Sequence, residues 1–522
     1  VALTPPATEA NNLADGAFTQ YFQLMPMYEY LLGVAPEGKD LQPQLATEWS
    51  LEPDGSSYRM KLRKGVAFHG GNGDFTAEDV RYNWEYRLKA EAPAFAPGLK
   101  TVLGPIKDVE VVNDYEIVLR ITTPEPTLFA SLSQQENQFQ IVSAKDGRSR
   151  GPFKQPTLAE KPIAGTGPYG YDTREQSRYL RYARAESKHW RQTPEFPEIE
   201  YRWIKENSTR LAALLAKEIH VANVPLEMTE AAEKAGFKVV SGKSPGTYVL
   251  GSFYGVWMNK QLRPTEQLNP DPNATYVFPD SPMMDVRVRK ALNIAIDRDA
   301  LNKAFVQGKG QPMHIAYFRS DRPGWNPEWQ TRFKEAYGYD PEAAKKLLAD
   351  AGYGPNRPLS TTWLVSPPRP ALTSAGDMVE AIAGYWRKIG VDIKMNSEDE
   401  ATRSNKINRL VDVDNHSNLI VSGLSQFIGV GVYNSTFRSI RSGVQLKELD
   451  DVFREIAKTM DPKRADELWR QWGNQAYQQY VNMPLFWLPA EVLVDPAIVS
   501  DWVFPGSISG TYSHLEYIKA AR

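Results

Sequence analysis

A chain of 522 residues is longer than one hydrophobic core normally serves, and this length sets the first limit on its fold. We therefore expect two or three structural units. The composition, 42% hydrophobic and 24% charged, is typical of globular domains. A membrane span needs about 18–20 consecutive apolar residues. The longest candidate, residues 419–433, is interrupted by glycines and a glutamine, so no span is predicted.

Charge and cysteine content exclude several classes of function. The 61 Lys and Arg nearly balance the 63 Asp and Glu, and no segment is a basic block, so we expect no binding to nucleic acid or to anionic membranes. The absence of cysteine excludes thiol catalysis, disulfides and Cys-ligated metals, and suits an oxidising compartment without requiring one. The residues that follow Val1 do not form the charged n-region of a signal peptide, so we expect that any export leader has been removed. Whether a lipid anchor preceded Val1 is left undecided.

Alternating apolar residues indicate that the front half is rich in strands. Residues 57–68 alternate with period two, as in a half-buried strand. Thr76 and Asp79 form a capping-box pattern, which predicts a helix that starts at that point. Residues 109–112 and 117–121 are predicted to be paired strands.

The back half is richer in helices. We predict helices over 285–306, from Pro341 to Gly352, over 378–388, over 447–459 and over 462–480, with a strand at 391–395. Asp340-Pro341 and Asp461-Pro462 each place a capping carboxylate before a proline at the first helical position. The pattern predicts a mixed α/β fold with at least two lobes.

The sequence gives no positive case for catalysis. Residues 165–170 match the letters of the dinucleotide fingerprint, but Pro168 removes a backbone donor and a strand pattern follows, so we interpret the segment as a turn. The six histidines are scattered, and no zinc, serine-hydrolase or Walker motif occurs. We expect no cofactor, no metal and no catalytic residue.

Five segments in order resemble the family 5 solute-binding proteins of ABC importers, which include dipeptide, oligopeptide and nickel receptors. The resemblance covers nearly the whole chain, and its first block, which begins at Leu41-Gln42-Pro43 and ends at Asp79-Val80, is the most specific. The segments are 41–80, 165–169 with Trp190, 286–298, 340–353 and 386–391.

The resemblance implies the fold of a type II periplasmic binding protein, with two lobes that close about a hinge and an inserted β-rich third domain. Domain I would comprise residues 1–35, 165–252 and 488–522, domain II residues 36–164, and domain III residues 253–487. The two crossings are expected near 250–260 and 480–490, with Tyr254–Asn259 and Pro484–Leu488 as hinge strands. In this framework His69 is interpreted as structural.

The resemblance also suggests where a ligand would bind. Peptide-binding members hold the ligand's ammonium group with an acidic residue after a strand of domain III, and the matching position here is Gln426. A buried ammonium without a carboxylate is unfavourable, whereas an amide suits hydroxyl or amide groups. An error of one or two residues in this placement would weaken the argument from Gln426, and Asp412 or Asp414 could then serve as the acidic residue. The predicted ligand-binding residues are Phe18, Tyr21, Trp363, Arg369, Gln426, Phe427 and Tyr433.

We therefore predict a periplasmic or extracytoplasmic, monomeric receptor without enzymatic activity, which captures a peptide-like, oligosaccharide or opine-like solute and delivers it to the permease subunits of an ABC importer. One alternative is a carbohydrate-active enzyme with an aromatic-lined cleft, which would need two facing carboxylates about 5–10 Å apart. Another is a transcription regulator with a similar sensor domain. It would need an added helix-turn-helix and a basic face, and we see no room for these before Pro5.

Overall fold

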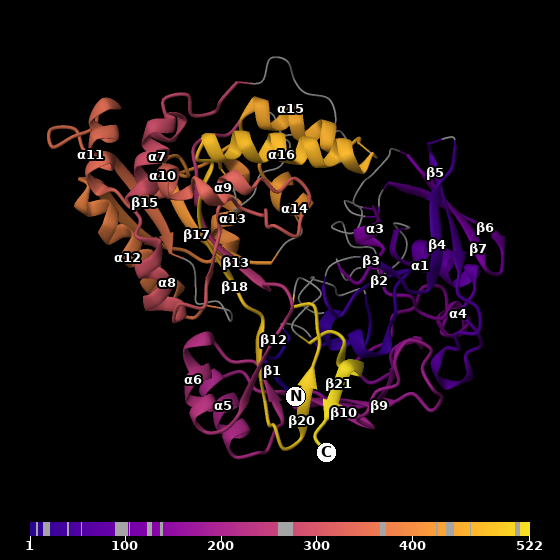
Figure 1. Cartoon of the computed structure of the whole chain (residues 1–522). Coiled ribbons are helices and arrows are strands. Elements are labelled where there is room, and N and C mark those ends of the chain that lie inside the picture. Colours follow the sequence, from indigo (N-terminus) through magenta and orange to yellow (C-terminus); the bar gives the residue numbers. More distant parts are fainter. Residues whose placement is uncertain are drawn as a thin grey trace. The chain divides into compact units, whose positions relative to one another are not determined.

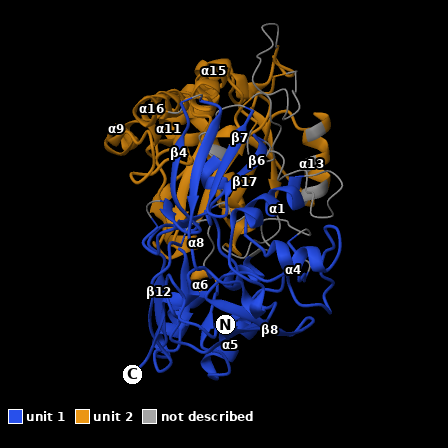
Figure 2. Cartoon of the chain, turned by 90° about the vertical axis from the view of Figure 1, so that its right-hand side faces the viewer, with its two compact units in different colours: residues 1–224, 228–246, 490–522 blue, residues 225–227, 247–489 orange. Residues whose placement is uncertain are grey.

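The computed structural model divides the chain into two compact units, which Figure 2 colours separately. Unit 1 comprises residues 1–224, 228–246 and 490–522, and unit 2 comprises residues 225–227 and 247–489. The three-domain division expected from the sequence stays a prediction. The structure describes the chain except residues 7–8, 14–20, 39–40, 54, 89–102, 104, 123–127, 136–138, 259–274, 366–371, 424–425, 435–442, 460 and 507–511.

Unit 1 is built on a seven-stranded sheet of order β12-β19-β11-β1-β10-β9-β8 and a four-stranded antiparallel sheet of order β4-β5-β7-β6 (Figure 1). In the larger sheet β1 is parallel to β10 and β11, and the other neighbours are antiparallel. Its strands are β1 (Ala2–Leu3), β8 (Tyr169–Glu175), β9 (Tyr179–Arg184), β10 (Glu198–Trp203), β11 (Val221–Ala222), β12 (Lys238–Ser241) and β19 (Glu491–Val494).

The smaller elements of unit 1 agree with the sequence pattern. The four-stranded sheet holds β4 (Ala46–Leu51), β5 (Ser57–Leu62), β6 (Ile106–Asn113) and β7 (Glu116–Ile121), and the expected alternation in β5 buries Tyr58, Met60 and Leu62. The capping box is confirmed, because the Asp79 carboxylate accepts from the Thr76 backbone nitrogen at 2.8 Å. Also present are β2 (Leu32–Val34), β3 (Leu41–Pro43), β20 (Val499–Trp502), β21 (Ile518–Ala520), α1 (Ala77–Leu88), α3 (Leu128–Ser131), α4 (Ala144–Ser149), α5 (Asn207–Leu215) and α6 (Leu226–Lys234), whose first two residues belong to unit 2.

Unit 2 is built on a six-stranded mixed sheet of order β14-β18-β13-β17-β15-β16, with helices packed against it (Figure 1). Helix α12 packs on β15, β16 and β17. The strands are β13 (Thr247–Phe253), β14 (Gln311–Pro312), β15 (Ser360–Val365), β16 (Asp392–Ser397), β17 (His416–Ser422) and β18 (Asn482–Leu488). The helices are α7 (Val286–Ile294), α8 (Arg298–Val306), α9 (Pro327–Thr331), α10 (Phe333–Tyr337), α11 (Pro341–Asp350), α12 (Ala375–Lys388), α13 (Glu400–Arg409), α14 (Gln426–Gly431), α15 (Lys447–Ile456) and α16 (Pro462–Gln478).

One predicted element of unit 2 is wrong. The single helix expected over 285–306 is two helices, α7 and α8, because the Asp297 side chain accepts from the Ala300 backbone nitrogen at 2.9 Å and starts a second helix. The two proline-started helices are confirmed. Asp340 and Asp461 accept from Ala343 and Arg464 backbone nitrogens at 2.9 and 2.7 Å.

The chain passes between the units at residues 246/247 and 489/490, apart from the short excursion at 225–227. The second passage lies in the range expected for a hinge crossing, and the first lies just before its expected range. The segment Pro484–Leu488 lies in β18, which pairs with β13 inside the sheet of unit 2. Residue 259, the last of the other expected hinge strand, lies outside the described residues.

Candidate functional site

The carboxyl ends of three parallel strands mark one edge of the unit 2 sheet. β15 is parallel to β16 on one side and to β17 on the other. The chain leaves β15 through α12 to β16, and then returns through α13 to β17 on the opposite side of β15. A crevice at such a topological switch point, outside the carboxyl ends of the strands, is where open α/β sheets bind ligands.

Two of the predicted binding residues follow the strands that flank this switch point. Gln426 comes four residues after β17 ends at Ser422, and it opens α14. Its side chain is buried, and Nε2 donates to the Pro323 carbonyl oxygen at 2.9 Å. Arg369 follows the end of β15 in the sequence and lies outside the described residues. The strand order brings the ends of β15 and β17 together at one edge, and the joint role of Gln426 and Arg369 in one site stays a prediction.

Trp363 and Tyr433 lie in the core of unit 2. Trp363, on β15, is fully buried and its ring lies 5.1 Å from that of Trp386, while its indole Nε1 has no hydrogen-bond partner in the described part of the chain. The Tyr433 hydroxyl accepts from Asn482 Nδ2 at 2.9 Å. Both positions serve core packing, and their roles in ligand binding stay predictions.

The other predicted aromatic positions give less information. Phe18 lies outside the described residues. Tyr21 is in the short helix η1 (Tyr21–Gln23) and Phe427 is in α14, but the side chains of both lie outside the described part of the structure. Their proposed stacking on a ligand stays a prediction.

Two arginines and a tryptophan gather at the same edge of unit 2, and the sequence analysis did not single them out. Trp487 lies near the end of β18 and pairs with Tyr248, which in turn pairs with Ser422 at the end of β17. The guanidinium carbons of Arg319 and Arg322 lie 5.3 and 5.4 Å from the Trp487 ring centre. Both distances are within cation–π range. We refer to Arg319, Arg322 and Trp487 as the arginine–tryptophan cluster.

Helix α14 is held close to this cluster by a glycine. A Cβ atom on Gly429 would lie 2.1 Å from Cδ1 of the buried Tyr317 ring, so only glycine allows the helix to approach so closely. The Tyr317 ring also contacts Tyr248 and Tyr433, with centre distances of 5.1 and 6.2 Å. Gln426 is therefore held by its own hydrogen bond to Pro323 and by the close approach of its helix to Tyr317 at Gly429.

The carboxyl edge of the unit 1 sheet is built differently. Arg210 of α5 is 1% exposed, and its guanidinium joins the segments that follow three parallel strands. It donates to the Thr4 hydroxyl at 3.0 Å, to the Ile204 carbonyl at 2.6 Å and to the Asn223 carbonyl at 2.9 Å, just beyond β1, β10 and β11. Further bonds go to the Lys205 carbonyl and the Asn207 side chain. This arginine fixes the backbone at that edge.

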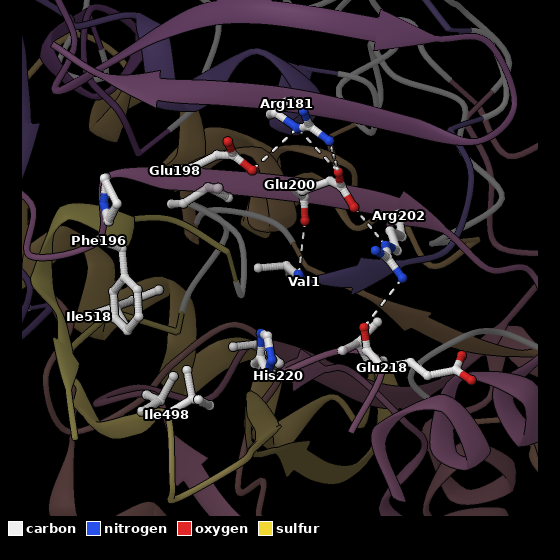
Figure 3. Close-up of a pocket in the computed structure, with 15 residues that line it drawn as sticks. Val1, Arg181, Phe196, Glu198, Glu200, Arg202, Glu218, His220, Ile498 and Ile518 are labelled. Carbon is white, nitrogen blue, oxygen red and sulfur yellow. Dashed lines mark hydrogen bonds and ion pairs between the residues drawn. The ribbon is translucent and has the colours of Figure 1, made fainter. Parts of the chain in front are cut away.

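A pocket of about 530 Å³ lies at the opposite, amino-terminal end of the same strands (Figure 3). It opens beside Val1, between the start of β10 and residues 218–221, and Ile498 and Ile518 line its apolar side. Four of its charged side chains form ion pairs: Glu200 lies 2.7 Å from Arg181 and 2.6 Å from Arg202, and Glu198 lies 3.3 Å from Arg181. Because parallel α/β sheets bind ligands at carboxyl ends, we do not assign the solute to this pocket.

Unit 1 also contains a buried network of charged side chains. Glu29 is fully buried and accepts from Thr166 Oγ1 at 3.0 Å and from Trp190 Nε1 at 3.1 Å. Arg191 lies between Glu29 and Glu516, and burial of the ring lowers the pKa of the nearby His189. The network joins segments far apart in the sequence, as expected for a structural role. His69 fits this interpretation, since its Nε2 lies 2.8 Å from the Gly167 carbonyl oxygen.

Two general features of the described residues bear on function. No helix among them combines the length and apolar character needed to cross a membrane. In the same part of the chain, no three His, Cys, Asp or Glu side chains are placed to hold a metal ion together.

The fold is that of the periplasmic binding proteins, as comparison with solved structures shows. NikA from Brucella suis, solved with Fe(III)-EDTA, superposes with a TM-score of 0.78 and 19% identity over 100% of this chain and 99% of that chain. The sequence model for bacterial extracellular solute-binding proteins, family 5, matches residues 40–423. The chain belongs to this family, which confirms the resemblance drawn from the five segments.

Curated relatives extend the comparison. The chain is 29% identical over 383 residues to heme-binding protein A of Haemophilus influenzae and 26% identical over 390 residues to the dipeptide-binding protein of Escherichia coli. These alignments cover 70% and 71% of this chain, and 63% and 66% of the relatives. The chain therefore spans slightly less than two thirds of the length of these two proteins.

Proposed function

We propose that the protein captures a small polar solute outside the cytoplasm and delivers it to the permease subunits of an ABC importer, without chemical change to the solute. The observation that carries this proposal is the match to the family 5 solute-binding proteins over residues 40–423. The named ligands of its relatives, heme and a dipeptide, support a small-molecule or short-peptide solute over a macromolecular partner.

The solute is proposed to bind at the carboxyl edge of the unit 2 sheet, at the switch point between β15 and β17. Gln426, Phe427, Tyr433, Trp363 and Arg369 of unit 2 would contact the solute at this edge. Phe18 and Tyr21, which belong to unit 1, remain predicted ligand-binding residues. Gln426 supports a ligand group recognised by neutral hydrogen bonds, as in saccharides, opine-like conjugates or blocked peptides. A free ammonium group would lack a carboxylate partner at this position.

The same proposal includes the domain organisation and the assembly state. Residues 36–164 would form domain II, which is consistent with a four-stranded sheet whose strands all lie between Ala46 and Ile121. Residues 1–35, 165–252 and 488–522 would form domain I, and residues 253–487 domain III. We propose a monomer in the periplasm or at the outer surface of the membrane.

A solute screen tests the proposed function. Purified protein is heated with dipeptides, tripeptides, heme, opines and oligosaccharides, and positive solutes are titrated by calorimetry. A solute at a hundred times its dissociation constant should stabilise the protein by about 2.7 kcal/mol. If no solute shifts the unfolding midpoint, the receptor proposal is wrong.

Mass spectrometry of the recovered solute separates the receptor from the enzyme alternative. A receptor returns its solute unchanged after prolonged incubation. Hydrolysis of an oligosaccharide, at a rate that depends on protein concentration, would favour the carbohydrate-active enzyme instead.

A further inference from the structure

The pocket beside Val1 lies between two strands of the unit 1 sheet. β1 is parallel to both of these neighbours, and its pairing starts at Arg202 of β10 and at Ala222 of β11. β10 itself begins earlier in its sequence, at Glu198. The pocket, of about 530 Å³, is bordered by the first residues of these two strands, with Val1 between them (Figure 3). It therefore continues the line of β1 beyond the amino end of that strand.

Backbone groups of β10 face this pocket. The Glu200 carbonyl oxygen accepts from the Val1 nitrogen at 2.9 Å, and the Arg202 nitrogen donates to the Val1 carbonyl oxygen at 2.9 Å. In a strand, every second residue directs its N–H and C=O groups to the same side. The Glu200 N–H and the Glu198 C=O therefore point to the side of β1, ahead of the bonds that Val1 makes.

β11 presents a backbone donor from the other side of the pocket. The His220 carbonyl oxygen accepts from the Asp495 nitrogen at 2.9 Å, on the side of β19. The N–H of the next residue, Val221, therefore faces the opposite side, where β1 lies. Among the described strands, none is in register to pair with the Glu200 and Val221 N–H groups or with the Glu198 carbonyl. These two donors and one acceptor are placed as a longer β1 would need them.

The surroundings of the pocket suit an uncharged peptide backbone. Ile498 and Ile518 line its apolar side, and burial lowers the pKa of the Val1 amine to about 5. A charged amine is therefore unfavourable at this position. A peptide N–H would donate the same hydrogen bond to the Glu200 carbonyl without placing a charge there.

We propose that the pocket is a binding site for two extended residues joined to the nitrogen of Val1, which lengthen β1 between β10 and β11. The residue next to Val1 would accept a hydrogen bond from the Val221 N–H. The residue before it would accept from the Glu200 N–H and donate to the Glu198 carbonyl. This pocket is in unit 1 and the proposed solute site is in unit 2, so either could be wrong without the other.

A linked segment is favoured over a free peptide of the same sequence. Two residues form too few hydrogen bonds to offset the translational and rotational freedom that a separate molecule loses on binding. Residues attached to Val1 have already lost this freedom, because β1 holds them at the pocket. A leader, tether or fused segment attached ahead of Val1 would then leave the molecule from within the sheet.

Hydrogen exchange tests the site in proteins that differ only ahead of Val1. The parent starts at Val1, a second form carries Thr-Val before it, and a third carries Pro-Pro. Threonine and valine favour strands, whereas proline lacks the N–H group and is not accommodated in central strands. With Thr-Val we expect exchange at the Glu200 and Val221 amides to be at least about tenfold slower than in the parent. With Pro-Pro the rates should stay close to those of the parent.

Two comparisons control for indirect effects. Amides of β8, at the far edge of the same sheet, should exchange at the same rate in all three forms. Free acetyl-Thr-Val-amide, added in excess to the parent, should leave the Glu200 and Val221 amides unprotected.

Slower exchange at these two amides with Thr-Val alone would support the site. Equal slowing by Thr-Val and Pro-Pro would mean that added residues only shield the pocket, and no slowing by either would mean that β1 is not lengthened. Either result overturns the site, as does an equal slowing in β8, which would indicate a general change in stability. If the free dipeptide protects the parent as well as the linked residues do, the pocket binds separate peptides and the linked occupant is wrong.

Discussion

The carboxyl edges of the two sheets use arginine in opposite ways. In unit 1, Arg210 is buried and donates to backbone carbonyls and side chains that follow three parallel strands. In unit 2, Arg319 and Arg322 stack on Trp487 at the end of a strand. A guanidinium surrounded by carbonyl oxygens fixes the backbone, whereas Arg319 and Arg322 pack on a buried aromatic ring. The same residue type thus joins backbone segments at one edge and packs on an aromatic side chain at the other.

The largest expected effect tests the structural arginine. Arg210→Met would remove the donors to Ile204 and Asn223 and leave their carbonyls buried without these bonds. We expect a loss of about 3–5 kcal/mol in the free energy of unfolding, measured by urea denaturation. Arg357→Met, at an exposed position, is the control and should change stability by less than about 0.5 kcal/mol. A loss similar to that of the control would mean that Arg210 does not hold the unit 1 edge.

A pair of glycine substitutions tests how α14 is held in unit 2. Gly429→Ala would force a methyl group against the buried Tyr317 ring, and we expect it to destabilise the protein by about 1–3 kcal/mol. Gly384→Ala, in α12 where no atom lies within 4 Å of the added Cβ, should stabilise it by about 0.5–1 kcal/mol. Thermal unfolding measures both. Effects of the same sign would contradict the close packing of α14 on Tyr317.

A smaller effect is expected at Gln426. Gln426→Leu removes the hydrogen bond to the Pro323 carbonyl and should destabilise the protein by about 1 kcal/mol. Gln330→Leu, on the exposed side of α9, is the matched control and should be close to neutral. Calorimetry on the same variants shows whether the amide also contacts solute. Unchanged affinity for every solute would exclude Gln426 as a polar anchor.

The last prediction compares how the stability of each unit depends on pH. Burial lowers the pKa of His69, His189, His220 and His514 in unit 1, and of His314 in unit 2. Where a histidine stays neutral in the folded protein, the free energy of unfolding decreases as the pH falls below the unfolded histidine pKa of about 6.5. The reason is that the unfolded chain binds the proton first. Between about pH 7 and pH 5, unit 1 should therefore lose more stability than unit 2.

Native-state hydrogen exchange, read separately for peptides of each unit, measures this difference. His514→Gln should reduce the acid sensitivity of unit 1, since the ring is buried next to Ser513 and the Val34 carbonyl. Equal acid sensitivity in the two units would show that other groups dominate the pH dependence.

Local chemistry made most elements predictable from the sequence. The capping carboxylates Asp340 and Asp461 mark helix starts because they act on backbone nitrogens three residues away. Asp297 caps the start of α8 in the same way. Because this cap was not used in the prediction, α7 and α8 were predicted as one helix over 285–306. No local sequence pattern indicates the order of the strands around β15. That order depends on the side of β15 to which the chain returns after each connecting helix.

The candidate site shows the same limit more sharply. Gln426 could be proposed because the family resemblance supplied the register, and Arg369 because it flanks a proline-rich loop. Arg319 and Arg322 could not, because their significance comes from Trp487, which is far away in the sequence and reaches them only through the folded sheet. Trp363 and Tyr433 illustrate the reverse difficulty, since an aromatic residue has the same pattern in a core as in a binding site.

The order in which the strands are synthesised has a consequence for the life of the chain before it folds. β13, near the middle of the unit 2 sheet, needs β18 as a neighbour, and β11 and β12 of unit 1 need β19. Both partners belong to the last 41 residues of the chain, 482–522. Neither sheet can therefore be completed before residues 482–494 have been synthesised, and contacts this distant in sequence form slowly. Completion of both units therefore depends on one short segment of the chain.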